Sequence, residues 1–207
     1  MTSATHLLQT SALDEETARS ELYGLLAFLY YAPPATEFLA NLRVATTEAP
    51  AAGAFLEEPW RALVGVAREM TDEAIRQEYN TLFEGLGKPD VYLYGSHFLS
   101  GFLNEKPLAR LRTELNALGL ARDEAMSETE DHIAYLCEVM RYLIAGEDVA
   151  VANLTRQRAF FSTHLQPWVT QLCDDLQQHP KAHFYAALAE LTRAFMSVEA
   201  QGFDMLA

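Results

Sequence analysis

A group of acidic residues and a histidine near position 130 offers the most chemistry in this sequence. Glu128, Glu130, Asp131 and His132 lie close together in the stretch SETEDHIAYLCEVM, which covers residues 127–140. Such residues could bind a metal ion, carry out acid–base chemistry, hold a cationic partner or begin a helix. Each of these functions requires particular further residues elsewhere in the chain.

The spacing of the histidines does not favour a metal site. A di-iron helical bundle needs two Glu-x-x-His pairs, and none of the six histidines has a glutamate three residues before it. His179 and His183 are four apart, but Pro180 occupies the position where a metalloprotease helix carries its glutamate. We therefore predict no metal ion and no other cofactor.

Motifs of hydrolytic and nucleotide-dependent enzymes do not occur in the sequence. There is no Gly-x-Ser-x-Gly. The only Gly-Lys pair, at 87–88, is followed by a proline, and Leu82 stands where a phosphate-binding loop would have glycine. Adjacent residues on a helix diverge by about 100°, so Asp131 and His132 would not point at one spot. The sequence therefore predicts a protein that is not an enzyme.

Apolar residues recur with helical periodicity in the segments that must position these residues. Ser11 and Asp14 have the spacing of a capping box, which predicts the start of the first helix. We predict helices from Ser11 to the prolines at 33–34, and over 35–46, 59–70, 71–83, 105–118, 127–146, 148–178 with a bend at Pro167, and 182–200, with loops at 47–56 and 85–104. The prediction is an all-α, single-domain helical bundle over 1–207, with a hinge at 119–127.

The acidic cluster falls at the start of one of these predicted helices. Ser127 and Glu130 have capping-box spacing, which predicts that the helix begins at residue 127. His132 would then lie at the edge of the apolar stripe, and Asp131 on an acidic and aromatic face with Tyr135, Glu138 and Tyr142. That face could be ordinary solvated surface or a docking surface for a basic peptide.

The charge balance narrows the class of partner. The formal net charge is −14, and the only lysines are Lys88, Lys106 and Lys181, so nucleic acid is a poor partner and cationic partners are favoured. No lysine or arginine precedes Arg19, although a secretory signal peptide would require one, and the uncharged run 22–36 is too short and proline-broken to span a membrane. Both cysteines lie in apolar helical patterns, typical of buried, reduced thiols. We expect a cytoplasmic protein without stable membrane insertion.

Several segments resemble one known family. Glu128-x-x-Asp131-His132-Ile133 resembles the signature of the TorD/DmsD/NarJ family of redox-enzyme maturation chaperones, with Thr129 where a proline is common. Other segments resemble family segments in the same order: LYGLLAFLYYAPP (22–34), EYNTLFEGLG (78–87), YLYGSHFL (92–99), QRAFFSTHLQPW (157–168) and HFYAALAELTRAFM (183–196).

The resemblance implies a TorD-like fold and a chaperone function. Such a chaperone binds the precursor of a molybdenum or tungsten oxidoreductase catalytic subunit, often through its twin-arginine signal peptide, and assists cofactor insertion before export. The resemblance also implies a monomer or a domain-swapped homodimer. Three alternatives stay open: a NarJ-like assembly factor for a subunit that is not exported, a weak nucleotide-binding or nucleotide-hydrolysing protein, and a structural subunit of a larger complex.

The residues and the resemblance together predict a signal-peptide site. We expect Asp131 to bind an arginine with support from Glu128, and His132 to orient the site or contact the peptide backbone. His132 would also make binding sensitive to pH near neutrality. Ser96 is also expected to bind the peptide. An apolar groove is expected from the following residues, which could equally be ordinary core: Tyr23, Tyr79, Leu82, Phe83, Tyr92, Tyr94 and Phe98.

Overall fold

The computed structural model describes residues 3–47, 55–85, 87–123 and 126–205, with side chains from residue 15 onward. Within these residues the chain forms ten helices, and its only β-type pairing is an isolated antiparallel bridge between Tyr94 and His132. The helices are α1 (Ser3–Tyr31), α2 (Thr36–Arg43), α3 (Glu57–Glu69), α4 (Asp72–Phe83), α5 (Gly95–Ser100), α6 (Lys106–Ala117), α7 (Ile133–Ala145), α8 (Leu154–His164), α9 (Val169–Gln178) and α10 (Phe184–Asp204). The prediction of an all-α bundle is confirmed.

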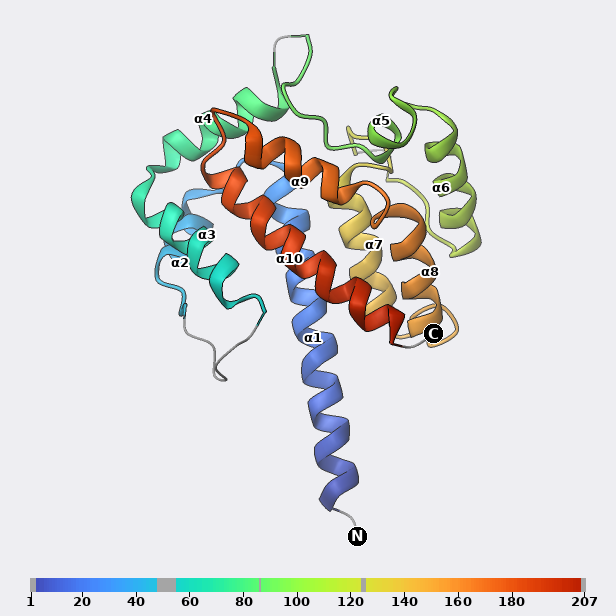
Figure 1. Cartoon of the computed structure of the whole chain (residues 1–207). Coiled ribbons are helices and arrows are strands. Elements are labelled where there is room, and N and C mark those ends of the chain that lie inside the picture. The colour runs from blue at the N-terminus through green and yellow to red at the C-terminus, as the bar shows by residue number, and fades with distance from the viewer. Residues whose placement is uncertain (1–2, 48–54, 86, 124–125, 206–207) are drawn as a thin grey trace.

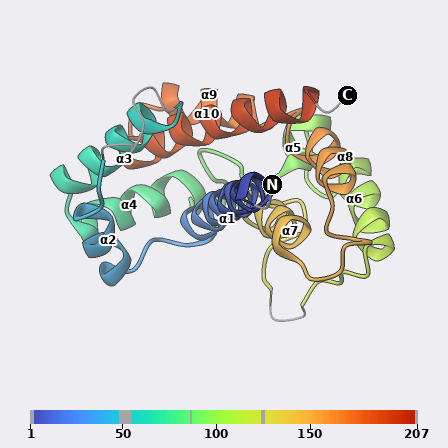
Figure 2. The same cartoon turned by 90° about the horizontal axis from the view of Figure 1, so that it is seen from below.

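Helix α1 is the centre of the arrangement. It packs against α7 more extensively than any other two described helices pack together, and its first turns project beyond the rest of the molecule (Figure 1). Seen from below, α2, α3 and α4 lie on one side of α1 and α5 to α8 on the other, while α9 and α10 run along one face (Figure 2). In the described part of the chain, no helix is both long and apolar enough to cross a membrane.

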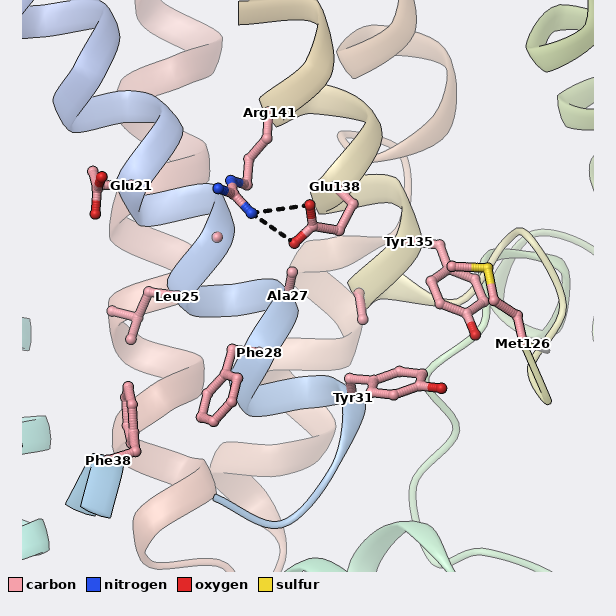
Figure 3. A pocket seen from close by; sticks show the side chains of 12 residues that line it. Glu21, Leu25, Ala27, Phe28, Tyr31, Phe38, Met126, Tyr135, Glu138 and Arg141 are labelled. Atoms are coloured by element: carbon pink, nitrogen blue, oxygen red, sulfur yellow. Dashed lines mark hydrogen bonds and ion pairs between the residues drawn. The ribbon is translucent and has the colours of Figure 1, made fainter. Parts of the chain in front are cut away.

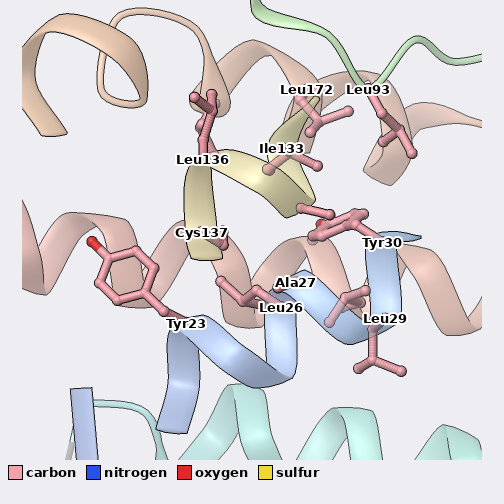
Figure 4. Packing of buried hydrophobic residues seen from close by; sticks show 14 of the residues in the cluster. Tyr23, Leu26, Ala27, Leu29, Tyr30, Leu93, Ile133, Leu136, Cys137 and Leu172 are labelled. Atoms are coloured by element: carbon pink, nitrogen blue, oxygen red, sulfur yellow. The ribbon is translucent and has the colours of Figure 1, made fainter. Parts of the chain in front are cut away.

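The contact between α1 and α7 forms the middle of the core (Figure 4). Leu26, Leu29 and Tyr30 of α1 are fully buried, and so are Ile133 and Cys137 of α7. Their spacing of three and four residues places them on one face of each helix. Burying one leucine or isoleucine side chain contributes roughly 1.5–3 kcal/mol, so this seam joins segments about a hundred residues apart firmly.

Two buried carboxylates fasten α10 to other helices. Glu199 of α10 accepts two hydrogen bonds from Arg19, at 2.7 and 2.8 Å, and one from the Tyr23 hydroxyl at 3.0 Å. Glu78 of α4 accepts hydrogen bonds from the three backbone N–H groups of residues 183–185, at 2.8–3.2 Å. These N–H groups belong to the first turn of α10, where no backbone acceptor is available. The start of α10 is thus capped by α4.

The beginnings of two predicted helices are wrong. The backbone is already helical from Ser3, so Ser11 lies inside α1 and does not begin it. The helix predicted from Ser127 begins at Ile133, and its N-cap is His132, whose Nδ1 accepts the N–H of Ala134 at 3.2 Å. Glu130 does not complete a capping box, because it pairs with Arg112 at 2.9 and 3.0 Å.

The structure differs from two other predictions, one in the second half of the chain and one in its middle. The helix predicted over 148–178 is two helices, α8 and α9, which are separated around Pro167 because proline has no N–H to continue the helix. The loop predicted at 85–104 contains the short helix α5. The loop predicted at 47–56 falls mostly on residues 48–54, outside the described residues, and the hinge at 119–127 stays a prediction because it includes residues 124–125, which are likewise outside them.

Candidate functional site

The isolated bridge brings the acidic cluster against the aromatic segment at 92–99. The N–H of Gly95 donates to the carbonyl of Asp131 and the N–H of Ile133 donates to the carbonyl of Leu93, both at 2.9 Å. Residues 131–133 and 93–95 therefore run antiparallel to each other. Two segments that the sequence suggested separately form one site.

Asp131 is buried and fully engaged within the chain. Only 3% of it is exposed, its Oδ2 accepts the N–H of Ser96 at 2.8 Å, and its Oδ1 accepts the hydroxyl of Thr129 at 2.6 Å. The prediction that it shares an exposed helical face with Glu138 is wrong, because Asp131 precedes α7. Its carboxylate instead holds the first turn of α5 in place.

His132 is buried among tyrosine rings. Its ring lies edge-on to Tyr94, at 5.1 Å between centroids, and to Tyr31, at 6.5 Å. Burial lowers its pKa to about 4, although the nearby charges of Glu128 and Asp131 act in the opposite direction. The expectation that His132 titrates near neutral pH is wrong, and the imidazole is neutral in the folded protein.

This lowered pKa predicts a loss of stability in weak acid. The unfolded chain binds a proton at His132 below pH 6.5 but the folded chain only below about pH 4, so stability falls as the pH drops between these values. From pH 7 to pH 5 we expect His132 to cost about 2 kcal/mol of unfolding free energy. His132→Asn keeps a capping oxygen but cannot titrate. Urea denaturation of both proteins at pH 7 and pH 5 tests this: equal losses would contradict it.

Glu128 is half-buried and oriented by two hydroxyl groups. The Tyr94 hydroxyl donates to its Oε2, and the Ser127 hydroxyl donates to its Oε1 at 3.1 Å. Burial and the hydrogen bond to Glu128 raise the pKa of Tyr94 above its usual range, so this phenol stays a donor. The carboxylate of Glu128 is therefore held in one orientation.

A cavity of about 250 Å³ opens beside Glu128. Its lining residues are Tyr31, Tyr79, Phe83, Glu84, Pro89, Val91, Leu93, Tyr94, Ser127, Glu128 and His132. The described residues of this lining include two acidic side chains and no lysine or arginine. We call it the acidic aromatic cavity.

The structure brings five of the predicted site residues to this cavity: Tyr79, Phe83, Tyr94, Glu128 and His132. It places Ser96 and Asp131 beside it, on a much smaller space next to His164. Sequence reasoning missed Tyr31 and Glu84. Tyr31 ends α1 just before a pair of prolines, and Glu84 follows the predicted aromatic residues of α4, which are the signals that could have found them.

The other predicted groove residues lie elsewhere. Tyr23 is fully buried and bonds to Glu199, and Leu82 is fully buried in the core. The ring of Tyr92 stacks on that of His97, with 4.0 Å between the ring centroids, and the ring of Phe98 stacks on that of Trp168, with 5.3 Å between the centroids. These four residues therefore make ordinary packing contacts, which was the alternative to a place in the groove.

A larger cavity, of about 680 Å³, lies between α1 and α7 and shares Tyr31 with the acidic aromatic cavity (Figure 3). Leu25, Phe28 and Phe38 give it an apolar wall, and Phe28 and Tyr31 are 45% and 43% exposed. An ion pair at 3.0 Å between Glu138 and Arg141 lies along its other side. We call it the apolar groove. The sequence signal for it is that the second half of α1 is apolar all round, so that one apolar face is left uncovered.

No group of three or more histidine, cysteine, aspartate or glutamate side chains in the described residues could hold a metal ion. The fold and site together define a helical bundle whose acidic aromatic cavity adjoins an exposed apolar groove. Residues 49–174 match the sequence model of the family described as nitrate reductase delta subunit. The chain therefore belongs to this family, the TorD/NarJ family of redox-enzyme maturation chaperones, and the resemblance seen in the sequence is confirmed.

Proteins named Chaperone protein TorD are similar to most of this chain. The one from Aliivibrio fischeri is 26% identical in an alignment of 211 residues that covers 92% of this chain and 96% of that protein. The one from Vibrio cholerae serotype O1, strain O395, is 24% identical in an alignment of 204 residues that covers 91% of this chain and 93% of that protein. The one from Photobacterium profundum is 26% identical in an alignment of 141 residues that covers 64% of this chain and 65% of that protein.

Proposed function

We propose that this protein is a cytoplasmic chaperone for the catalytic-subunit precursor of a molybdenum or tungsten oxidoreductase. It would bind the precursor's twin-arginine signal peptide and assist cofactor insertion before export. One observation carries the proposal: the acidic aromatic cavity opens beside the apolar groove, and Tyr31 belongs to both. A signal peptide of this kind has the same two parts, a basic pair followed by an apolar stretch.

The acidic aromatic cavity suits a guanidinium group. Glu84 and Glu128 supply carboxylates, with which guanidinium forms short, charge-assisted and often bidentate hydrogen bonds. Tyr31, Tyr79 and Tyr94 supply aromatic rings, and a cation over the face of such a ring is attracted by roughly 0.5–2 kcal/mol depending on how far it is desolvated. No basic side chain among the described lining residues competes for the two carboxylates.

The apolar groove suits the stretch that follows the arginines. Exposed aromatic area such as that of Phe28 and Tyr31 marks a binding surface when it is contiguous and lines a hollow. Covering it would contribute about 25 cal/mol for each Å² of apolar area removed from water. The acidic aromatic cavity would thus bind the basic pair and the apolar groove the apolar stretch, so that the two binding regions match the order of the two parts of the peptide.

The roles of the site residues follow from their positions. Glu128 and His132 line the cavity and would contact the peptide, with Tyr94 orienting Glu128. For Asp131 we now propose a positioning role, since both of its oxygens already accept hydrogen bonds from Ser96 and Thr129. The direct Asp131–arginine contact expected from the sequence would require this carboxylate, in a residue only 3% exposed, to become accessible to the peptide.

The direct test uses a charge-neutral variant of the cavity. Glu128→Gln is expected to weaken binding of a fluorescent Arg-Arg signal peptide about tenfold or more, because a charge-assisted hydrogen bond is lost from a half-buried site. Glu190→Gln is the matched control, with the same change in net charge at an exposed residue of α10. Fluorescence anisotropy measures both affinities. Equal affinities for the two variants would contradict the role of Glu128, and no binding by the unaltered protein would contradict the proposed function.

A second candidate is an assembly factor for a subunit that is not exported. The description of the matched family, nitrate reductase delta subunit, favours it. Capture of the client from the native host distinguishes the two candidates: a captured subunit with an N-terminal twin-arginine sequence supports the first, and one without it supports the second.

A further inference from the structure

A glycine in α1 lets an arginine side chain of α7 lie across that helix. Gly24 is in the interior of α1, where glycine is less favourable than alanine. A β-carbon added to it would lie 2.9 Å from Nε and 3.1 Å from Cζ of Arg141. Any side chain larger than hydrogen at position 24 would therefore displace this guanidinium group, and the close approach explains the glycine.

Arg141 lies at one end of the apolar groove and Tyr31 at the other (Figure 3). At a rise of about 1.5 Å per residue, the stretch of α1 from Gly24 to Tyr31 spans about 10 Å. The charged residues of the lining gather at the Arg141 end: Glu21, Glu138 and Arg141. The groove is thus apolar along this span and charged where the span ends.

The ion pair makes the charged end unfavourable for apolar groups. Nη1 of Arg141 donates to both carboxylate oxygens of Glu138 at 3.0 Å, and the two side chains are 44% and 49% exposed. An apolar group laid over the pair would remove water from both charges without replacing its hydrogen bonds. The groove therefore accepts apolar side chains from Tyr31 as far as Gly24 and not beyond.

We propose that Arg141, in the position that Gly24 allows, limits the length of the apolar stretch that the groove accepts. This inference rests on the proposed function and adds a length limit to it. The basic pair is held at the Tyr31 end, where the acidic aromatic cavity adjoins the groove, so the stretch that follows runs toward Arg141. A span of about 10 Å holds about three residues of an extended chain or about seven of a helix. Apolar residues beyond the limit would gain no further burial.

A series of Arg-Arg peptides with apolar stretches of about 2 to 12 leucine and alanine residues tests the limit by calorimetric titration. For the unaltered protein we expect affinity to rise with length until the groove is filled, and then to change by less than about twofold. In Arg141→Ala we expect the rise to continue, by about threefold or more for each further leucine, because the end of the groove is open. Gly24→Ala should extend the limit too, since its methyl group displaces Arg141.

Two matched controls separate this effect from a general loss of structure. Arg61→Ala removes an arginine of α3 that has the same 44% exposure as Arg141 and likewise pairs with a glutamate three residues before it. Gly65→Ala, also on α3, adds a methyl group where nothing lies within 4 Å. Both should keep the limit of the unaltered protein. The limit is read within each variant, so a uniform loss of affinity does not move it.

The outcomes separate the inference from the proposed function. If the limit is the same in Arg141→Ala as in the unaltered protein, or if the unaltered protein shows no limit, the inference is overturned while the proposed function stands. An unchanged limit in Gly24→Ala overturns the part assigned to Gly24. If the unaltered protein binds no Arg-Arg peptide, the proposed function fails, and the length limit fails with it.

Discussion

Replacing Glu78 by alanine is expected to lower the free energy of unfolding by about 3–5 kcal/mol. Glu78 is only 6% exposed, and its carboxylate accepts hydrogen bonds from the backbone N–H groups of His183, Phe184 and Tyr185 at 2.9, 3.2 and 2.8 Å. The truncation leaves three N–H groups at the start of α10 without an acceptor and removes a negative charge from the positive end of its dipole. The effect exceeds that of an ordinary N-cap, about 1 kcal/mol, because this cap is charged and buried.

Urea denaturation followed by circular dichroism measures this loss. Glu73→Ala, on the same helix but with a side chain 74% exposed, is the matched control, and we expect it to lose less than about 1 kcal/mol. Glu78→Gln should fall between them, because the amide keeps one acceptor oxygen but not the charge. A loss below 1 kcal/mol in Glu78→Ala would show that α10 does not depend on α4 for its cap.

Replacing Glu199 by alanine is expected to cost a similar amount, about 3–5 kcal/mol. The substitution removes a buried partner from Arg19, whose side chain is 16% exposed, and leaves the Tyr23 hydroxyl without its acceptor. Breaking a buried pair from one side is costly because the remaining charge has been taken out of water and is no longer compensated. The ion pair connects α1 to α10, so the loss should appear in the cooperative unfolding of the whole bundle.

A double substitution distinguishes loss of the pair from loss of packing. Arg19→Met with Glu199→Leu removes both charges and keeps apolar volume, and we expect it to be more stable than Glu199→Ala alone. Thermal and urea unfolding of the single and double variants measures the difference. If the double variant is less stable than Glu199→Ala, the buried charges themselves are not the source of the loss.

Most helices of this fold could be predicted because their signals are local. Thr71 is a clear example: its hydroxyl accepts the N–H of Ala74, and Asp72 and Glu73 occupy the first turn of α4. The positions of Tyr79 and Phe83 at the end of α4 also follow from helical spacing. Local pattern thus predicted one wall of the acidic aromatic cavity before any tertiary contact was known.

The start of α7 could not be predicted, because distant residues decide it. Ser127 and Glu130 have the spacing of a capping box, yet Arg112 pairs with Glu130, residues 129–132 form a turn, and the bridge to Tyr94 fixes His132 in an extended conformation. Asp131 was placed on a helical face for the same reason: the helical wheel assumed a helix that begins at residue 127, whereas α7 begins at Ile133. Tertiary contacts of this kind override local propensity.

The long-range fastening of α10 has a consequence for the protein while it is being made. The acidic aromatic cavity is lined by Tyr31 of α1, Tyr79 of α4 and His132 at the start of α7. Two contacts of α10 hold the bundle around it: Glu78 of α4 caps the start of α10, and Glu199, near the end of α10, pairs with Arg19. Contacts between residues so far apart in sequence form late, after the entropy of closing long loops has been overcome. A nascent chain still lacking α10 should therefore have no stably formed cavity, and if the cavity binds a client as proposed, capture should begin only once α10 has been synthesised.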